Sequence, residues 1–168
     1  MSRVLLLRHS KAARAEPGMR DFERPLEERG IRHAMAVGEA MAAAGLRPHT
    51  VLCSTARRTR ETWDGVLRTL GTVPSDIRYL DDLYHSDAVG YIAAIRSADP
   101  AESVLVIGHN PMTAEAASML VGSGERAEIA SMRSRFPTSA LAVIGFATPL
   151  AQIGPGAGTL ETWLTRDG

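Results

Sequence analysis

The chain has 168 residues, of which 45% are hydrophobic, and its 19 basic and 19 acidic residues give a formal net charge of zero. This length suits one compact core rather than two, and we expect residues 1–168 to form a single domain. The balanced charge, without a long basic block, argues against a broad nucleic-acid-binding surface. A single cysteine, Cys53, excludes an internal disulfide framework and is typical of a reducing compartment.

Targeting and metal-binding signals are absent from the sequence. No apolar run is long enough for a membrane span or for the core of a signal peptide, because Arg8 interrupts the first one. No set of cysteines and histidines has the spacing of a zinc site. We therefore expect a cytoplasmic protein that needs no metal and no cofactor, and the sequence does not indicate an oligomeric state.

The first predicted strand is the apolar run Val4-Leu5-Leu6-Leu7, which shows no alternation with polar residues. Such a run is typical of a strand buried on both faces in the middle of a parallel sheet. Arg8 and His9 follow it and would lie at its carboxyl end, where open α/β sheets bind ligands. A cation beside a histidine, which is a neutral nucleophile near pH 7, indicates an anionic substrate and a reaction at this edge.

After this strand, extended segments alternate with helical ones, which is the pattern of a βαβ fold. The further predicted strands lie at residues 50–53, 77–80, 103–107, 140–146 and 160–164. The predicted helices lie at residues 25–45, 56–70, 87–97 and 111–121, and polar segments lie at residues 11–24 and 122–137. We expect a three-layer α/β/α sandwich with a mostly parallel central sheet and helices on both faces.

Local signals set the expected ends of the first two helices. Pro25 should open the first helix, since proline is tolerated in the first turn, and Gly45 should end it. Ser54 and Thr55 offer N-cap hydroxyls for the second helix, and Gly71 should end that helix.

Three strand ends carry residues that are capable of chemistry. The first strand leads to Arg8 and His9, the second to Ser54 and the run Arg57-Arg58-Thr59-Arg60, and the fourth to His109. Because the carboxyl ends of parallel strands meet at one edge of a sheet, we expect these residues to converge.

These residues carry a family resemblance. Leu7-Arg8-His9 resembles the Arg-His signature of the histidine phosphatase superfamily, in its phosphoglycerate mutase-like branch. Residues 54–62 resemble that superfamily's second motif, in which an arginine follows the serine by four residues; this spacing selects Arg58 and not Arg57. Residues 106–111 resemble the third motif, which carries the second histidine.

A fourth element narrows the resemblance. Residues 21–26, which contain Arg24-Pro25-Leu26, are similar to the Arg-Pro-Leu element of the SixA-like phosphohistidine phosphatases. The likeness spans roughly residues 3–122. The sequence departs from the common pattern at Ser10, Thr55 and Glu61, and none of these departures removes a phosphate ligand.

The resemblance implies that His9 attacks phosphorus in line and forms a phosphohistidine intermediate, which water then hydrolyses. Arg8, Arg24 and Arg58 would surround the phosphoryl group, because the planar guanidinium matches phosphate oxygens. His109 would hydrogen-bond those oxygens, and Ser10 is a further candidate for substrate binding. No metal is implied, since the arginines supply the positive charge.

The proton for the leaving group has a separate candidate. Related phosphatases with alcohol leaving groups use a glutamate after the third strand, and Asp82 is its positional counterpart here. A phosphohistidine substrate needs less help, because its imidazole can leave already protonated. The missing glutamate favours an N–P bond as the bond cleaved, with a phosphohistidine protein of a phosphorelay or phosphotransfer system as the substrate.

Several alternatives stay open on the sequence alone. The same residues would serve a small-molecule phosphomonoesterase or a phosphate-binding module without activity. A cysteine-dependent phosphatase would need an arginine six residues after Cys53, where Thr59 stands. A mutase would need a larger lid than the short stretch between Tyr84 and Ser103 provides.

Overall fold

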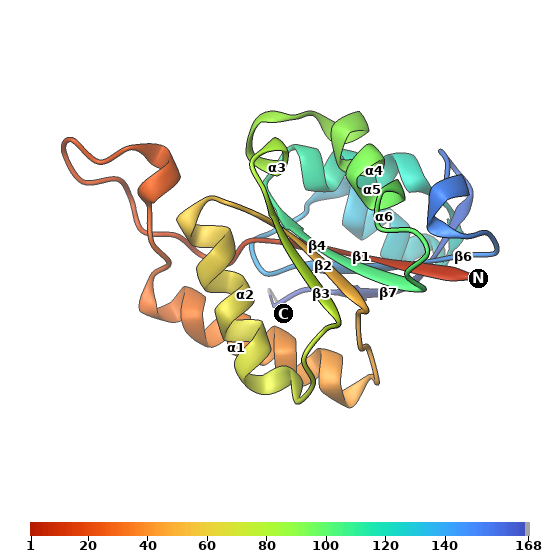
Figure 1. Ribbon diagram of the computed structural model, residues 1–168, viewed down its shortest axis with the longest axis horizontal. Coiled ribbons are helices and arrows are strands. Elements are labelled where there is room, and N and C mark those ends of the chain that lie inside the picture. The colour runs from red at the N-terminus through yellow and green to blue at the C-terminus, as the bar shows by residue number, and fades with distance from the viewer. Residues whose placement is uncertain (167–168) are drawn as a thin grey trace.

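The structure is a computed structural model that describes residues 1–166, and it confirms the three-layer α/β/α architecture (Figure 1). Its seven-stranded sheet has the order β3-β2-β4-β1-β6-β7-β5. The strands are β1 (Ser2–Arg8), β2 (Thr50–Ser54), β3 (Asp76–Leu80), β4 (Ser103–Gly108), β5 (Val121–Gly124), β6 (Leu141–Phe146) and β7 (Gly158–Leu164). The first four run parallel to one another, whereas β6 runs antiparallel to β1 and β7.

Helices cover both faces of the sheet. The α-helices are α1 (Glu28–Ala43), α2 (Arg57–Leu70), α3 (Asp82–His85), α4 (Ala88–Arg96), α5 (Met112–Leu120) and α6 (Arg126–Ser134), with 3-10 turns η1 (Asp21–Glu23) and η2 (Leu150–Gln152). Figure 1 shows α1 and α2 below the sheet and the other four α-helices above it. Within residues 1–166, no helix is both long and apolar enough to cross a membrane.

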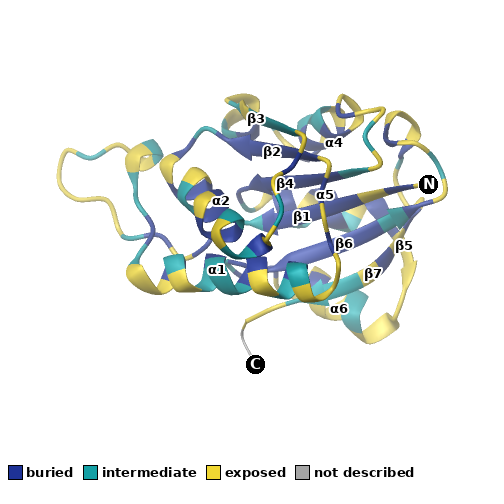
Figure 2. Cartoon of the chain, turned by 60° about the horizontal axis from the view of Figure 1, so that its bottom comes forward, coloured by how far each residue is buried: buried dark blue, intermediate teal, exposed yellow. Residues whose placement is uncertain are grey.

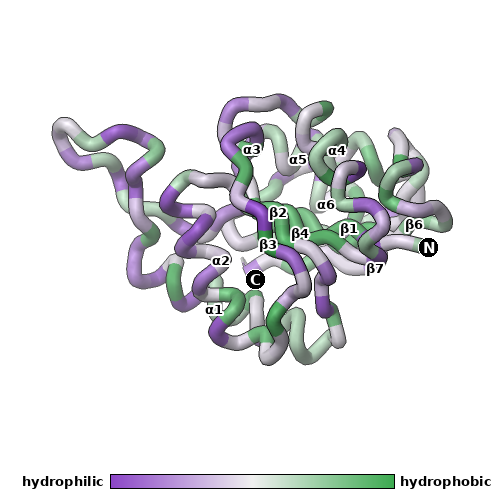
Figure 3. The backbone as a smooth tube through the Cα atoms, in the orientation of Figure 1, coloured by the Kyte–Doolittle hydropathy of each residue, from purple (hydrophilic) through white to green (hydrophobic). Residues whose placement is uncertain are grey.

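Strand β1 lies at the centre of the sheet and is buried on both faces, as its sequence predicts. Val4 and Leu6 belong to the core on the α4 and α5 side, whereas Leu5 and Leu7 belong to the core on the α1 and α2 side. Figure 2 shows the central strands in the dark blue of buried residues, and Figure 3 shows the same region as the apolar part of the chain. Because each buried leucine contributes about 1.5–3 kcal/mol, this strand holds its carboxyl end firmly in place.

Helix α2 is held against α1 by two glycines at their contact. A Cβ atom on Gly38 would collide with the backbone of Val66, and one on Gly65 would lie 2.6 Å from the Cβ of Ala34. The two helix backbones can therefore approach closely. This packing fixes the position of α2, which carries Arg58 in its first turn.

The starts of the first two helices differ from the prediction. Helix α1 begins at Glu28 rather than at Pro25, because the chain there is extended and Leu26 forms a β-bridge with Ala12. Helix α2 begins at Arg57, and neither Ser54 nor Thr55 caps it. The Ser54 hydroxyl instead contacts His109, and the Thr55 hydroxyl donates to Asp81. Gly71 ends α2 in a left-handed conformation, as predicted.

Among the strands and α-helices, three short elements were not predicted from the sequence. Helix α3, strand β5 and helix α6 each bury a single residue, namely Leu83, Val121 and Met132. One buried residue gives no periodic pattern, so the polar composition of residues 122–137 concealed β5 and α6.

The segment that follows β1 extends well away from the sheet before it returns to α1, and Figure 1 shows it in red to orange. It contains η1 (Asp21–Glu23), which lies against the start of α2. This segment therefore brings Asp21, in the element that contains Arg24-Pro25-Leu26, next to Arg58 of the second motif.

Candidate active site

The predicted site residues converge at the carboxyl edge of the sheet. His9 follows β1, Arg58 lies in the first turn of α2, and His109 follows β4. They border a cavity of about 270 Å³, which we call the His9 pocket. Its lining residues are Arg8, His9, Lys11, Ala12, Arg24, Arg58, His109, Asn110 and Thr138.

The imidazole of His9 is held in one tautomer. Its Nδ1 atom lies 2.7 Å from the carbonyl oxygen of Ser10. A carbonyl oxygen only accepts, so Nδ1 donates its proton to it and Nε2 keeps a free lone pair. Burial lowers the pKa of His9 to about 3 against the effect of the Ser10 hydrogen bond, and the charges of His109, Arg58 and Arg8 lower it further. His9 is therefore neutral at pH 7, with the Nε2 lone pair available.

Ser10, whose carbonyl oxygen holds the His9 imidazole, is itself fixed by two hydrogen bonds. Its backbone N–H donates to the Thr62 hydroxyl at 2.9 Å, and its own hydroxyl bonds that of Ser139 at 2.7 Å. Ser139 has a φ of 63°, a strained conformation for a residue with a side chain. Ser10 is fully buried and is not among the residues that line the pocket. The structure thus gives Ser10 a role in positioning His9, while direct substrate binding by Ser10 stays a prediction.

His109 lies beside His9, with ring centroids 5.4 Å apart. Its Nε2 atom is 2.8 Å from the Ser54 hydroxyl, and its backbone N–H donates to Tyr91 Oη at 3.0 Å. The Ser54 oxygen already accepts the Ala56 N–H at 3.3 Å, so its own proton can go to Nε2 and leave Nδ1 as the donor toward the pocket. Burial, then Arg58 and Arg8, lower the pKa of His109 to about 4, although Asp21 opposes this.

The three predicted arginines all reach the pocket. Arg8 donates from Nη1 to the carbonyl oxygen of Phe136 at 3.0 Å. Arg58 donates from Nη1 and Nη2 to the carbonyl and carboxylate oxygens of Asp21, at 2.9 and 3.0 Å. Arg24 donates from Nη1 to the other carboxylate oxygen of Asp21 at 3.0 Å. Asp21 thus joins two of the three arginines.

Several buried polar atoms of the pocket residues have no partner among the described residues. Three are nitrogens: Arg8 Nε, Arg58 Nε and His109 Nδ1. Burying a donor without an acceptor costs about 1–3 kcal/mol, so such groups are rare unless a ligand or water completes them. Three of them around one cavity are suited to an anion with several oxygen atoms.

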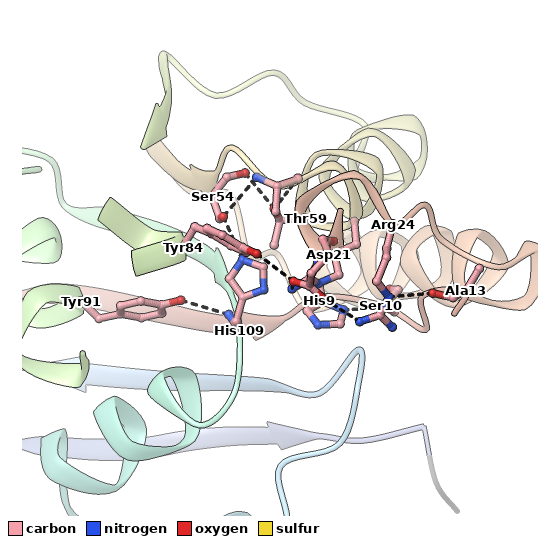
Figure 4. A network of polar contacts seen from close by, with 12 residues as sticks. His9, Ser10, Ala13, Asp21, Arg24, Ser54, Thr59, Tyr84, Tyr91 and His109 are labelled. Atoms are coloured by element: carbon pink, nitrogen blue, oxygen red, sulfur yellow. Dashed lines mark hydrogen bonds and ion pairs between the residues drawn. The ribbon is translucent and has the colours of Figure 1, made fainter. Parts of the chain in front are cut away.

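Asp21 and Tyr84 are site residues that sequence reasoning did not single out. The Tyr84 hydroxyl donates to the Asp21 carboxylate at 2.8 Å, and the Tyr84 ring lies 5.4 Å from that of His109 (Figure 4). Burial alone would raise the pKa of Asp21, but the hydrogen bonds from Arg24, Tyr84 and Arg58 lower it to about 2. The available signal was the spacing of Asp21 three residues before Arg24. Nothing in the sequence marks Tyr84 as its partner.

Asp82 is not brought to this pocket. It is an exposed residue at the start of α3, and it is not among the lining residues. Its role as the proton donor stays a prediction. The neighbouring Asp81 accepts the Thr55 hydroxyl proton at 2.6 Å, which accounts for the absence of an N-cap at Thr55.

Other parts of the structure offer less for catalysis. Cys53 is fully buried in β2, and burial raises the pKa of its thiol far above neutrality, so it is not an available nucleophile. A cavity of about 580 Å³ lies where β1 and β4 begin, and Arg3 and Glu161 pair within it. Among residues 1–166 no three His, Cys, Asp or Glu side chains group so as to hold a metal ion.

Comparison with known proteins agrees with this geometry. The family model of the histidine phosphatase superfamily (branch 1) matches residues 4–135. The uncharacterised protein Rv1276c of Mycobacterium tuberculosis is 38% identical over 157 residues, which cover 92% of this chain and 96% of that protein.

Solved structures show the same fold over the whole length. A candidate phosphohistidine phosphatase SixA from Agrobacterium tumefaciens is 35% identical, with a TM-score of 0.83 and coverage of 98% of this chain and 97% of the other. The protein histidine phosphatase SixA complexed with tungstate has a TM-score of 0.77 at 23% identity, with coverage of 97% and 96%. The match over residues 4–135, together with these neighbours, shows that the chain belongs to the histidine phosphatase superfamily, branch 1, and is SixA-like.

Proposed function

We propose that this protein removes the phosphoryl group from a phosphohistidine protein through a covalent phosphohistidine on His9. The observation that carries the proposal is the set of three buried, unpartnered donors on Arg8, Arg58 and His109, in the pocket that also holds the neutral His9. These donors suit the oxygens of a phosphoryl group, on which most of the transition-state charge lies.

In the first step, the Nε2 lone pair of His9 attacks phosphorus. The bond from phosphorus to the substrate nitrogen breaks, and its electron pair stays on that nitrogen. Because Nδ1 of His9 keeps its proton on the Ser10 carbonyl, the intermediate is an N-phosphoimidazolium, which is a good leaving group. Arg8, Arg58 and His109 hold the phosphoryl oxygens throughout.

In the second step, water attacks phosphorus and the electron pair of the N–P bond returns to His9 Nε2. Both protons of the water stay on the product, dihydrogen phosphate, which then equilibrates with solvent. Charge and atoms therefore balance without a base that removes a proton in this step.

The electrostatics of the pocket support an N–P bond as the bond cleaved. Asp21 contacts two pocket arginines, but with a pKa of about 2 it is ionised at neutral pH and has no proton to give. The pKa of Tyr84, which donates to Asp21, is raised, so it is a weak acid as well. An alkoxide leaving group would find no proton on Asp21 and only a weak acid in Tyr84, whereas the imidazole of phosphohistidine leaves neutral if its other nitrogen is protonated.

A protein substrate is supported by the surface beside the pocket. A second cavity of about 470 Å³ lies between the extended segment and the start of α2, lined by Met19, Phe22, Glu23, Thr55, Arg57 and Arg60. It offers room for the residues that flank a phosphohistidine. The name of the Agrobacterium neighbour and the single buried cysteine fit a cytoplasmic phosphohistidine phosphatase.

The experiment is a comparison of kcat/KM on a phosphohistidine protein and on phenyl phosphate, for the wild type and for His9→Ala. We expect the wild type to favour phosphohistidine strongly and the variant to have no turnover on either substrate. Equal values on both substrates would favour a small-molecule phosphomonoesterase. Phosphopeptide binding without turnover in the wild type would favour a binding module.

A further inference from the structure

Asn110 carries a buried polar atom that has no partner among the described residues. This atom is an acceptor, whereas the three nitrogen atoms described above are donors. It lies between the end of β4 and the start of α5, next to His109 in the sequence, and it lines the His9 pocket. Its Oδ1 atom is buried and has no hydrogen-bond partner within residues 1–166. An oxygen acceptor in a pocket for an anion is unexpected, because it would repel phosphoryl oxygens.

The orientation of this amide is fixed by its other end. Asn110 Nδ2 donates to the carbonyl oxygen of Phe136 at 2.8 Å. Since a carbonyl oxygen cannot donate, the nitrogen must lie on that side and Oδ1 must be the free atom. The same carbonyl accepts from Arg8 Nη1 at 3.0 Å, so Asn110 and Arg8 lie side by side.

The chemistry of the second step calls for an acceptor of this kind. Among the lining residues of the His9 pocket there is no carboxylate that could orient a water molecule. The second step needs no proton removal, only a water held with its oxygen toward phosphorus. An amide oxygen, which accepts a hydrogen bond without taking the proton, meets this need.

We propose that Asn110 Oδ1 accepts a hydrogen bond from the water that hydrolyses the phosphohistidine on His9. Asn110 is thus a catalytic residue of the second step and not of the first. This inference rests on the proposed function, since it presupposes the intermediate.

The test separates the two steps by rapid quench with ³²P-labelled phosphohistidine protein. For Asn110→Ala we expect phosphoenzyme formation near the wild-type rate, and hydrolysis slower by about 100-fold, the scale of a lost positioning contact. Labelled His9 should then accumulate in the steady state. Asn110→Ser, whose side chain is shorter and lacks the amide oxygen, should show the same split.

The controls distinguish positioning of water from support of Arg8. Arg8 binds the phosphoryl group in both steps, so a structural disturbance would slow both steps and weaken tungstate binding; that result would overturn the proposal.

Thr138→Val removes the other side-chain oxygen among the lining residues. A selective loss of hydrolysis in that variant, with Asn110→Ala unaffected, would also overturn the proposal. Absence of labelled enzyme in the wild type would overturn the proposed function as well, whereas unchanged hydrolysis in both Asn110 variants would overturn only the role of Asn110.

Discussion

Asp21 holds Arg58 with two different oxygen atoms: its backbone carbonyl accepts Nη1 at 2.9 Å and its carboxylate accepts Nη2 at 3.0 Å. The two residues come from segments 37 positions apart in the chain. The contact leaves Arg58 Nε as the buried atom without a partner among the described residues. Asp21 therefore fixes the guanidinium plane of Arg58, which lines the His9 pocket.

The first prediction concerns this clamp. Asp21→Asn should lower kcat/KM by about tenfold, because Arg58 and Arg24 each lose a charge-assisted hydrogen bond that orients them. The free energy of unfolding should change by less than about 1 kcal/mol, since the Asp21 carboxylate is half exposed. Steady-state kinetics and thermal unfolding measure the two effects. Full activity in the variant would show that the arginines do not depend on Asp21.

The second prediction tests the choice of Arg58 among three neighbouring arginines. Arg58→Lys should lower kcat/KM by at least about tenfold, because an ammonium group cannot replace the planar fork of donors. Arg57→Lys and Arg60→Lys are matched controls on the same helix, both at exposed positions. Because both line the second cavity and not the His9 pocket, the comparison also uses tungstate affinity, which only Arg58→Lys should lower. Arg57 pairs with Glu61 on the surface, where an ion pair adds little. Comparable losses in all three variants would count against a specific role of Arg58.

The third prediction follows from the low pKa of His109, which is about 4 in the free protein. A bound dianion favours the imidazolium and raises this pKa, so the complex holds more protons than the free protein. Affinity for tungstate should therefore increase as pH falls from about 8 to about 6. Calorimetry in buffers of different ionisation enthalpy measures the proton uptake. His109→Gln should greatly reduce the uptake; an equal uptake in that variant would refute the assignment.

The same histidines predict the pH dependence of stability without an anion. Folding lowers the pKa of His9 to about 3 and that of His109 to about 4, below the ordinary value of 6.5. Between these values the unfolded chain binds more protons, so the free energy of unfolding should fall as pH drops below about 6.5. Urea unfolding of His109→Gln over this range should show a shallower fall than the wild type. If the free energy of unfolding fell equally with pH in the variant and in the wild type, carboxylates rather than His109 would dominate the pH dependence.

The sequence was sufficient for the parts of the site that lie at strand ends. Uniform burial of β1 and the spacing of the second motif led correctly to Arg8, His9 and Arg58 in one pocket with His109. Residues whose roles depend on a partner far away in the chain were not accessible in this way. Asp21 matters because η1 folds back onto α2, and Tyr84 because α3, a single turn, points it at Asp21. Neither turn has a periodic pattern that a sequence can show.

The fifth prediction removes the cysteine-dependent phosphatase as an alternative. Cys53→Ala should keep the activity of the wild type, because the thiol is buried in β2 and donates to the Ser54 carbonyl away from solvent. The loss of packing should cost about 1 kcal/mol in the free energy of unfolding. Activity assays before and after treatment with iodoacetamide give a second measurement. Loss of turnover with an unchanged fold would restore Cys53 as a candidate.

The central claim is that His9 is the covalent nucleophile, and rapid quench with labelled phosphohistidine protein tests it most directly. The account predicts a phosphoenzyme that is labile in acid and stable in base, carries its label on His9, and disappears in His9→Ala while the variant still binds tungstate. Turnover without a labelled enzyme, or a label that persists in His9→Ala, would contradict the account.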